Sequence, residues 1–389
     1  MSIRKHKKTI RETRFAESVA MSNPIHEAIY RINVKHDLSE DEAYNVFREV
    51  LSISNDVERG ILMGILLNGL MAKTPTVEEA VGFIRAALSV DGNEPHQIPQ
   101  IDIGSKNKVI TLAGSGKKAI KTTNISSCAA IVAASLGVFV AKPCSKGTSS
   151  VSGSSDFMEE IGANLEISSD EMVKVMEKTK LGFFKIEGRI SKFDSLYGGK
   201  FHAPHILSLG LAAMILPFKS HILLYGLSHP NISLSAKVFK KLGYDEVMVV
   251  SSTDNGIHFF DEVGVFGSTS MIGIRGGVLG NIKIIQPGDL LKLPRYDRFS
   301  IRPGRDVSEN VKKSLDALSG KKKGAIVDMI CVNAATILYL GGKAVDMESG
   351  YVKAKKAIES GLAIKKIKEF VAATGGGSEA LEGLLKGKA

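Results

Sequence analysis

Apolar residues recur at helical spacing through the first quarter of the chain, with polar residues between them. One predicted helix begins at a capping box, because Ser39 is followed three residues later by Glu42. The same periodicity continues over 57–71 and 77–88. This pattern predicts a small helical domain over residues 23–90.

Beyond residue 106, short buried runs alternate with helical segments. Strands are predicted over 109–112, 138–141, 222–225, 246–250, 258–261 and 282–285. Helices are predicted over 126–136, 157–161, 169–178, 207–216, 233–242, 307–315, 325–340 and 351–371. Such alternation predicts an α/β fold with a mostly parallel central sheet flanked by helices, and ligands at the carboxyl ends of the strands.

The remaining segments lack a clear period. Residues 1–22 carry six lysines and arginines, and we expect a basic, mobile arm. A polar, proline-bearing linker is predicted over 91–106, so that the α/β domain spans 107–374. Residues 180–201 are polar and contain glycine, which is typical of an irregular lid or substrate loop. The glycine-rich end, 375–389, is predicted to be a flexible tail.

The chain is basic, with a net charge of +10 and a pI of about 9.3. Such a balance fits nucleic acid, anionic substrates or a lysine-rich surface. The absence of tryptophan and the aromatic content of 6% argue against a base-stacking surface. We therefore expect a phosphate-bearing small molecule as the partner, with nucleic acid as the weaker alternative.

No apolar run approaches 18 residues, so we expect no membrane span and no membrane partner. The three cysteines form no ligand cluster, and reduced thiols in the cytoplasm are the simplest interpretation. They are Cys128, Cys144 and Cys331.

Two loops rich in glycine, serine, threonine and lysine flank the predicted helix 126–136. Backbone N–H groups, short hydroxyls and lysines at the ends of elements suit an oxyanion. Asn124, Ser126 and Ser127 lie where the helix begins, so their free N–H and hydroxyl groups are candidates for anion binding. Positive charge is concentrated in the same loops at Lys117, Lys118, Lys121, Lys142 and Lys146.

The first loop matches neither common nucleotide motif. The GxxxxGK[ST] spacing is missing, and a GxGxxG motif starting at Gly114 would need glycine where Ala119 stands. A purely structural role for these loops stays open, because glycine- and serine-rich loops join elements in most α/β proteins.

Asp261 and Glu262 are adjacent carboxylates at a predicted strand end and are candidate oxygen ligands for Mg²⁺. Taken alone, such a pair is more often solvated surface. The histidines make no metal-binding pattern. His202 and His205 flank Pro204 in a predicted substrate loop, where a structural role is as well supported as a catalytic one.

The order of these motifs resembles the anthranilate phosphoribosyltransferase family, that is, glycosyltransferase family 3, whose fold is shared with class II nucleoside phosphorylases. The resemblance covers roughly Ile25 to Val371. It rests on 124–127, 140–142, Ser149-Ser150-x-x-Gly153-Ser154-x-Asp156, Asp261-Glu262, and the C-terminal Asp328-x-x-x-x-Asn333-Ala334-Ala335.

The resemblance implies a site for phosphoribosyl diphosphate and Mg²⁺. Gly114, Ser115 and Gly116 would cradle the diphosphate. Asn124, Ser126 and Ser127 would bind phosphate and Mg²⁺, with Ser126 as a metal ligand. Asp261 and Glu262 would complete the metal site. The full predicted phosphate site is Gly114, Ser115, Gly116, Lys117, Lys118, Asn124, Ser126, Ser127, Lys142, Lys146 and Ser150.

The chain departs from the family where chemistry is expected. The family's Gly-Thr-Gly-Gly-Asp-Gly is here Gly114–Ala119, with Lys118 in place of the acid. An ungapped match places the family's substrate-side histidine on Arg189, and its carboxylate-binding arginine beside Lys200. Together with His205, these residues are the predicted acceptor pocket, which therefore differs from one for anthranilate.

Three functions fit the sequence. We favour a phosphoribosyltransferase-like enzyme that uses a phosphorylated ribose donor and Mg²⁺ and has an altered acceptor pocket. A non-catalytic homologue could instead bind nucleic acid or another polyanion through the basic arm and the lysines. In a nucleoside phosphorylase, inorganic phosphate would take the diphosphate site. The helical domain is expected to form part of a homodimer interface.

Overall fold

The computed structural model describes most of the chain. The predicted basic arm lies outside the described part, as do Ser150 and Lys200. The described residues are 23–104, 107–147, 151–199 and 201–386.

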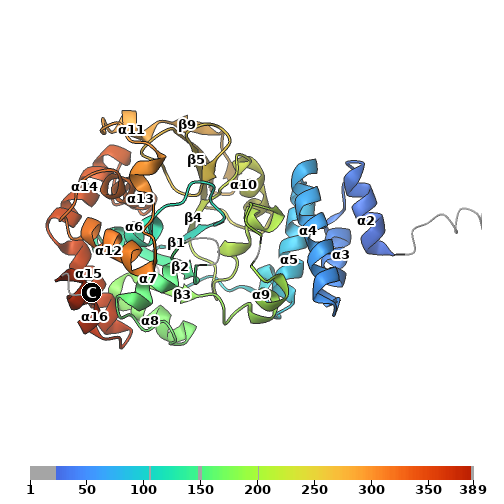
Figure 1. Cartoon of the computed structure of the whole chain (residues 1–389), viewed down its shortest axis with the longest axis horizontal. Helices are drawn as coiled ribbons and strands as arrows, with labels where there is room; N and C mark the ends of the chain where they lie inside the picture. The colour runs from blue at the N-terminus through green and yellow to red at the C-terminus, as the bar shows by residue number, and fades with distance from the viewer. Residues whose placement is uncertain (1–22, 105–106, 148–150, 200, 387–389) are drawn as a thin grey trace, which may run out of the picture.

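Helices alone form the N-terminal part of the described chain, which lies at one end of the molecule (Figure 1). The predicted capping box at Ser39 and Glu42 is present, and a second one joins Thr76 to Glu79. These caps fix where two of the helices begin. The helices are α2 (Pro24–Asn33), α3 (Glu40–Ser52), α4 (Asp56–Lys73) and α5 (Val77–Ser89).

The central sheet has nine strands among the described residues. The strands β3-β2-β1-β4-β5 are parallel neighbours, and β7 continues the sheet antiparallel to β5. The predicted α/β fold with a mostly parallel sheet is thus confirmed. The strands are β1 (Val109–Gly114), β2 (Phe139–Cys144), β3 (Leu181–Lys185), β4 (Ile222–Gly226), β5 (Val247–Thr253), β6 (Phe259–Phe260), β7 (Ser268–Arg275), β8 (Val278–Leu279) and β9 (Lys283–Ile285).

The two faces of the sheet belong to two cores, because successive side chains of a strand point to opposite faces. Leu224 of β4 packs in the core with the C-terminal helices. Its neighbours Leu223 and Tyr225 pack in the other core, together with Phe83 of α5. The N-terminal helices therefore share their core with one face of the sheet.

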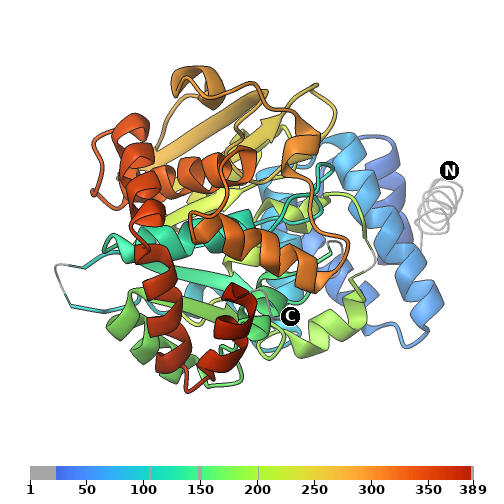
Figure 2. The ribbon, with the colours of Figure 1, turned by 60° about the vertical axis from the view of Figure 1, so that its left-hand side comes forward.

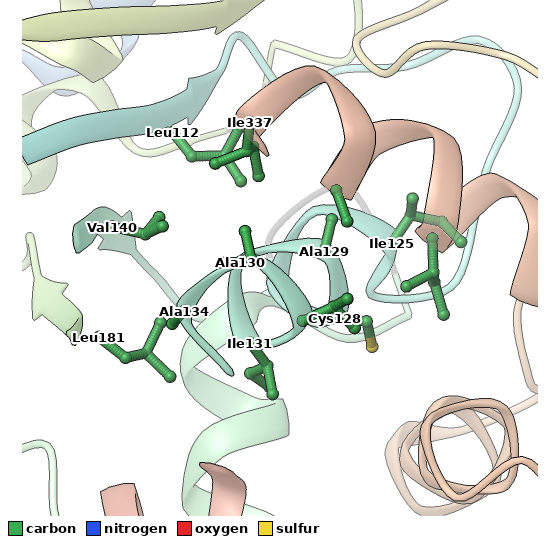
Figure 3. Packing of buried hydrophobic residues seen from close by; sticks show 14 of the residues in the cluster. Leu112, Ile125, Cys128, Ala129, Ala130, Ile131, Ala134, Val140, Leu181 and Ile337 are labelled. Carbon is green, nitrogen blue, oxygen red and sulfur yellow. The ribbon is translucent and has the colours of Figure 1, made fainter. Parts of the chain in front are cut away.

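Helix α6 (Ile125–Ser135) connects β1 to β2 and is almost entirely buried. Its small side chains allow close packing between the strands and α13 (Ala325–Leu340). Figure 3 shows Ala129 and Ala130 in the same packed layer as Leu112 of β1 and Ile337 of α13. This tight layer holds the N-terminus of α6 at a fixed place beside the end of β1.

The remaining helices cover the sheet and its edges, with the C-terminal ones on one face (Figure 2). The α-helices are α7 (Ser154–Glu160), α8 (Ser169–Thr179), α9 (Ser191–Tyr197), α10 (Ile232–Lys241), α11 (Pro287–Leu290), α12 (Val307–Leu318), α14 (Met347–Glu359), α15 (Leu362–Ala373) and α16 (Ser378–Leu385). Short 3₁₀ turns cover Pro95–Gln97, Ile206–Leu209, Leu211–Ala213 and Arg298–Ile301.

Two predicted segments differ in the structure. Residues 180–201 are not one irregular loop, because they contain β3 and α9. Strand β3 pairs with β2 and is buried through Phe184, a run too short to show a period. The predicted helix 207–216 is a pair of 3₁₀ turns. There the carbonyl oxygens of Ser208 and Leu209 accept hydrogen bonds from other elements.

The C-terminal predictions also need correction. The predicted helix 351–371 is two helices, because Gly361 has a φ of 77°, a left-handed conformation that ends a helix. The segment after 375, predicted to be a flexible tail, contains α16. Leu381 on this helix is fully buried, so its apolar side chain docks the helix on the core. Strand β7, which the sequence interpretation missed, mixes buried and exposed positions without strict alternation.

Candidate functional site

The carboxyl ends of the parallel strands surround a cavity of about 200 Å³, here called the first cavity. It is lined by residues of the loop after β1, the start of α6, the end of β2 and the segment after β6. Most of the predicted phosphate-binding and metal-binding residues meet there. They are Gly114, Gly116, Lys117, Lys118, Asn124, Ser126, Ser127, Lys142, Asp261 and Glu262.

Glycines let Asp261 approach the loop after β1. A Cβ on Gly114 would lie 2.5 Å from Asp261 Oδ2, and one on Gly226 would lie 1.8 Å from the Asp261 carbonyl oxygen. The Gly116 N–H donates to Asp261 Oδ2 at 2.9 Å. The loop is thus closed on Asp261 by backbone contacts that a side chain would prevent.

Lys118 lies against both carboxylates. Its ammonium donates to Glu262 Oε1 and, at 2.7 Å, to Thr122 Oγ1, and it is 3.3 Å from Asp261 Oδ1. Burial lowers the pKa of Lys118, but the charges of Glu262 and Asp261 outweigh burial and raise it. Burial also raises the pKa of Glu262, although Lys118 opposes this shift.

Lys142, at the end of β2, brings a second cation into the first cavity. Its side chain is buried, and it makes no hydrogen bond or ion pair with any residue that the structure describes. Burial lowers the pKa of Lys142, and Asp261 only partly offsets that effect. An anion bound in the cavity would supply the missing counter-charge.

The start of α6 adds backbone donors. Asn124 is the N-cap residue, but its side chain does not cap the helix. Its Nδ2 donates to the Gly153 carbonyl at 3.0 Å, and its Oδ1 accepts from Asn310 Nδ2 at 2.8 Å. Ser126 and Ser127 follow in the first turn, and both line the cavity. First-turn N–H groups have no partner within the helix, and they favour anions.

A second cavity of about 180 Å³ adjoins the first. Lys117, Ser145, Ile186 and Ala212 line both. Among the described residues, the wall of the second cavity carries the rings of Phe193, Tyr197 and His205, the carboxylates of Glu187 and Asp194, and the hydroxyl of Ser115.

Burial is the main cause of the pKa shifts of His205 and Lys117 in the second cavity. Tyr197 Oη and His205 Nε2 form a hydrogen bond of 2.5 Å. Burial and the charge of Lys117 lower the pKa of His205 to about 3, so its imidazole is neutral at pH 7. Lys117 lies 5.3 Å from the centre of the Tyr197 ring, and burial followed by repulsion from Lys121 lowers its pKa to about 8.

Some predicted site residues do not line either cavity. Arg189, predicted in the acceptor pocket, instead donates to the Ile215 carbonyl at 2.7 Å and to Asn93 Oδ1 at 3.1 Å. These bonds tie two connecting segments together and occupy the guanidinium. The backbone N–H of Lys146 donates to Glu187 Oε1, and its side chain is at the surface. His202 is exposed.

Other lining residues were absent from the predicted site. Thr122 belongs to the loop after β1, and its position between two lysines and the helix start was the available signal. Phe193 and Tyr197 lie on α9, inside the segment that the sequence interpretation treated as irregular. Their spacing of four residues puts both side chains on one face of a helix, and this spacing was the available sequence signal.

The chain is similar in sequence and in fold to known proteins. The model of the glycosyl transferase family, a/b domain, matches residues 106–364. A protein of Caldanaerobacter subterraneus named anthranilate phosphoribosyltransferase is 31% identical over 361 residues, covering 89% of this chain and 97% of that protein. The chain belongs to the anthranilate phosphoribosyltransferase family.

A further relative of the same name, from Polynucleobacter asymbioticus, is 29% identical and covers 91% of this chain and 99% of its own. Two solved structures share the fold. The anthranilate phosphoribosyltransferase of Thermus thermophilus has a TM-score of 0.69 at 22% identity, covering 89% of this chain and 99% of its own. That of Saccharomyces cerevisiae, in complex with PRPP and Mg, has a TM-score of 0.70 at 18% identity, covering 91% and 99%.

Proposed function

We propose that the protein transfers a ribose-phosphate group from phosphoribosyl diphosphate (PRPP) to an acceptor in the second cavity. The observation that carries the proposal is the buried ammonium of Lys142 in the first cavity, which lies beside the start of α6 and forms no hydrogen bond or ion pair with any described residue. A buried cation next to free helix N–H groups suits a phosphate. The named activity of the relatives supports this type of reaction.

Mg²⁺ is the proposed cofactor, with Asp261, Glu262 and Ser126 as the residues that would hold it. The donor set fits, because Mg²⁺ prefers carboxylate and hydroxyl oxygens. Glu262 Oε2 is buried without a hydrogen-bond partner among the described residues, and it lies in the first cavity with Ser126. When bound, Mg²⁺ would neutralise negative charge on the departing diphosphate.

The chain's own residues account for the rest of the proposed transfer. The acceptor's nucleophilic atom bonds to the anomeric carbon and gives up a proton to solvent. The bond between that carbon and the diphosphate oxygen breaks, and the diphosphate leaves with the electron pair. Lys142, Lys117 and the first-turn N–H groups of α6 bind that charge. Such preorganised donors stabilise a transition state in which the charge develops. Lys117 lies where the cavities adjoin, so it would contact the diphosphate on the acceptor side.

The second cavity supports an altered acceptor. Phe193 and Tyr197 provide an apolar face for a planar ring, whereas Glu187 and Asp194 bring negative charge. Its described lining contains no arginine, and Lys117 is its only lysine. We therefore propose an aromatic acceptor that carries hydrogen-bond donors such as amines, because an acceptor carboxylate would meet Glu187 and Asp194.

Calorimetric titration with PRPP, with and without Mg²⁺, tests the donor. We expect PRPP to bind in the presence of Mg²⁺, and binding at least tenfold weaker in Lys142→Met. Absence of PRPP binding to the wild-type protein would refute the proposed function. Phosphorolysis of common nucleosides in the same preparation would instead favour a nucleoside phosphorylase.

The N-terminal helices support a homodimer. Val57, Ile61 and Ile65 lie four residues apart on α4 and are exposed to 71%, 58% and 43%, so they form one apolar stripe. Tyr30 and Val34 at the end of α2 are also exposed. A stripe of this kind commonly marks a protein interface. We propose that a second copy of the chain covers it.

The cytoplasm is the proposed location. All three cysteines are free and buried, which fits a reducing compartment. No helix of the described residues is long and apolar enough to span a membrane.

A further inference from the structure

Lys118 occupies the position at which the proposed metal would neutralise Asp261 and Glu262. Its ammonium contacts one oxygen of each carboxylate, and the hydroxyl of Thr122 accepts a further hydrogen bond from it. The side chains of Asp261 and Glu262 are exposed to only 6% and 3%. Two buried carboxylates need a compensating charge, and in this structure the chain itself supplies it.

The position of Lys118 is fixed by the backbone on both sides. The Gly116 N–H donates to Asp261 Oδ2, and the Ala119 N–H donates to the Phe259 carbonyl at 3.0 Å. Lys118 stands between these two bonds, which hold its backbone next to the segment that carries the carboxylates. The contact is therefore part of the fold of the loop.

The neighbouring Lys117 provides a contrast. It follows the same glycines and carries the same charge, but its ammonium lies over the Tyr197 ring in the second cavity. Of the two adjacent lysines, only Lys118 forms an ion pair with the carboxylates. A general excess of positive charge in the loop does not account for this difference.

An ammonium and a divalent cation compete for the same oxygens. A carboxylate oxygen that ligates Mg²⁺ directly lies about 2.0–2.1 Å from the ion. Lys118 already contacts Glu262 Oε1 and Asp261 Oδ1. Glu262 Oε2 has no hydrogen-bond partner among the described residues, but a divalent cation bound to it would lie beside the ammonium of Lys118 and be repelled strongly where the dielectric constant is low. Tight binding of the metal at Asp261 and Glu262 therefore requires that Lys118 move away from them.

We propose that Lys118 is a built-in counter-ion that takes the metal's place at Asp261 and Glu262 in the free protein. A divalent cation then binds there only weakly until Lys118 is displaced. The inference rests on the proposed function only in assigning the metal to these carboxylates. It is tested without PRPP, so its failure leaves the binding of PRPP to be decided by the calorimetric titration described above.

The test uses Mn²⁺ as the probe, with free Mn²⁺ measured by electron paramagnetic resonance in the full-length protein. We expect Lys118→Met to bind Mn²⁺ at least tenfold more tightly than the wild type. Lys117→Met removes the same charge from the adjacent residue, and we expect its Mn²⁺ affinity to stay within threefold of the wild type. Unchanged affinity in Lys118→Met would overturn the proposal.

A double variant locates the site. We expect Lys118→Met combined with Glu262→Gln to lose the gain in Mn²⁺ affinity, because one carboxylate ligand is gone. A gain that persists in the double variant would place the cation elsewhere and contradict the proposal.

Wild type and Glu262→Gln keep the proposal testable if Lys118→Met does not fold. With Lys118 in place, we expect both proteins to bind Mn²⁺ equally weakly. Tight binding by the wild type that Glu262→Gln abolishes would show that Lys118 does not exclude the metal, and would refute the proposal.

Discussion

Single residues decide the chemistry that the first cavity can perform. Lys142 and Lys118 both bring positive charge there, but their environments differ. Lys118 is compensated by two carboxylates, whereas the ammonium of Lys142 forms no hydrogen bond or ion pair with the described residues. Lys118 is therefore suited to holding the loop together, and Lys142 to binding an anion that enters from solvent.

The pKa of Lys117 predicts how diphosphate binding depends on pH. Because this pKa is lowered to about 8, Lys117 loses its proton as the pH rises from 7 to 9. We expect the affinity for inorganic diphosphate to fall over that range, since a positive charge is lost. Calorimetry at three pH values measures the effect, and Lys117→Met should show a smaller fall. An affinity that rises with pH would contradict this role.

The close contact between Gly114 and Asp261 predicts that a side chain at position 114 lowers the stability of the fold. A Cβ at this position would lie 2.5 Å from Asp261 Oδ2, so Gly114→Ala must push the carboxylate or the loop aside. We expect a cost of about 1–3 kcal/mol in the free energy of unfolding. Gly188→Ala is the matched control, because a Cβ there meets no atom within 4 Å and the backbone is not left-handed. Denaturant unfolding of both variants measures the difference, and equal stabilities would contradict the packing at Gly114.

At the scale of elements, the sequence predicted those with a clear period or cap. The capping box at Ser39, strand β1 and helix α6 were all predicted close to their observed positions. Strand β3 was missed because Leu181–Lys185 is a short run that pairs with β2, and sequence periodicity carries no information about that partner. The 3₁₀ turns at 206–213 depend on hydrogen bonds from Tyr225 and Ser235, which are remote in sequence.

The same contrast between local signals and remote contacts decides which parts of the site could be predicted from the sequence. Its glycine loop and carboxylates could be predicted because they are local motifs. The side chains of α9 that line the second cavity could not, because that helix was not recognised. The ion pair between Lys118 and Glu262 joins residues 144 positions apart, and no local sequence pattern predicts it.

The docking of helix α16 on the core can be tested, since the sequence predicted a flexible tail there. Leu381 is fully buried, so we expect Leu381→Ala to cost about 2–5 kcal/mol in the free energy of unfolding. Glu379→Ala changes an exposed residue of the same helix and should cost less than about 0.5 kcal/mol. Denaturant titrations compare the two variants. Equal stabilities would show that α16 does not dock on the core.

At the scale of the whole molecule, the N-terminal helices share a core with one face of the sheet, while the C-terminal helices cover the other face. The cavities lie at the carboxyl edge of the sheet, between these two parts. The exposed stripe lies on the face of α4 turned away from the buried residues of that helix.

Sedimentation velocity tests the proposed homodimer. We expect the wild type to sediment with twice the chain's mass of 41.7 kDa. Ile61→Glu places a charge in the centre of the exposed stripe and should shift the protein to a monomer. Glu58→Gln, one turn away on the same helix, is the control and should leave the mass unchanged. A monomeric wild type would contradict the proposal.

A crystal structure of the protein soaked with PRPP and Mg²⁺ tests the proposed function most directly. We expect the diphosphate in the first cavity, in contact with Lys142 and the first turn of α6, with its ribose directed toward the second cavity. A first cavity without bound PRPP, or PRPP bound away from Lys142, would contradict the proposed function.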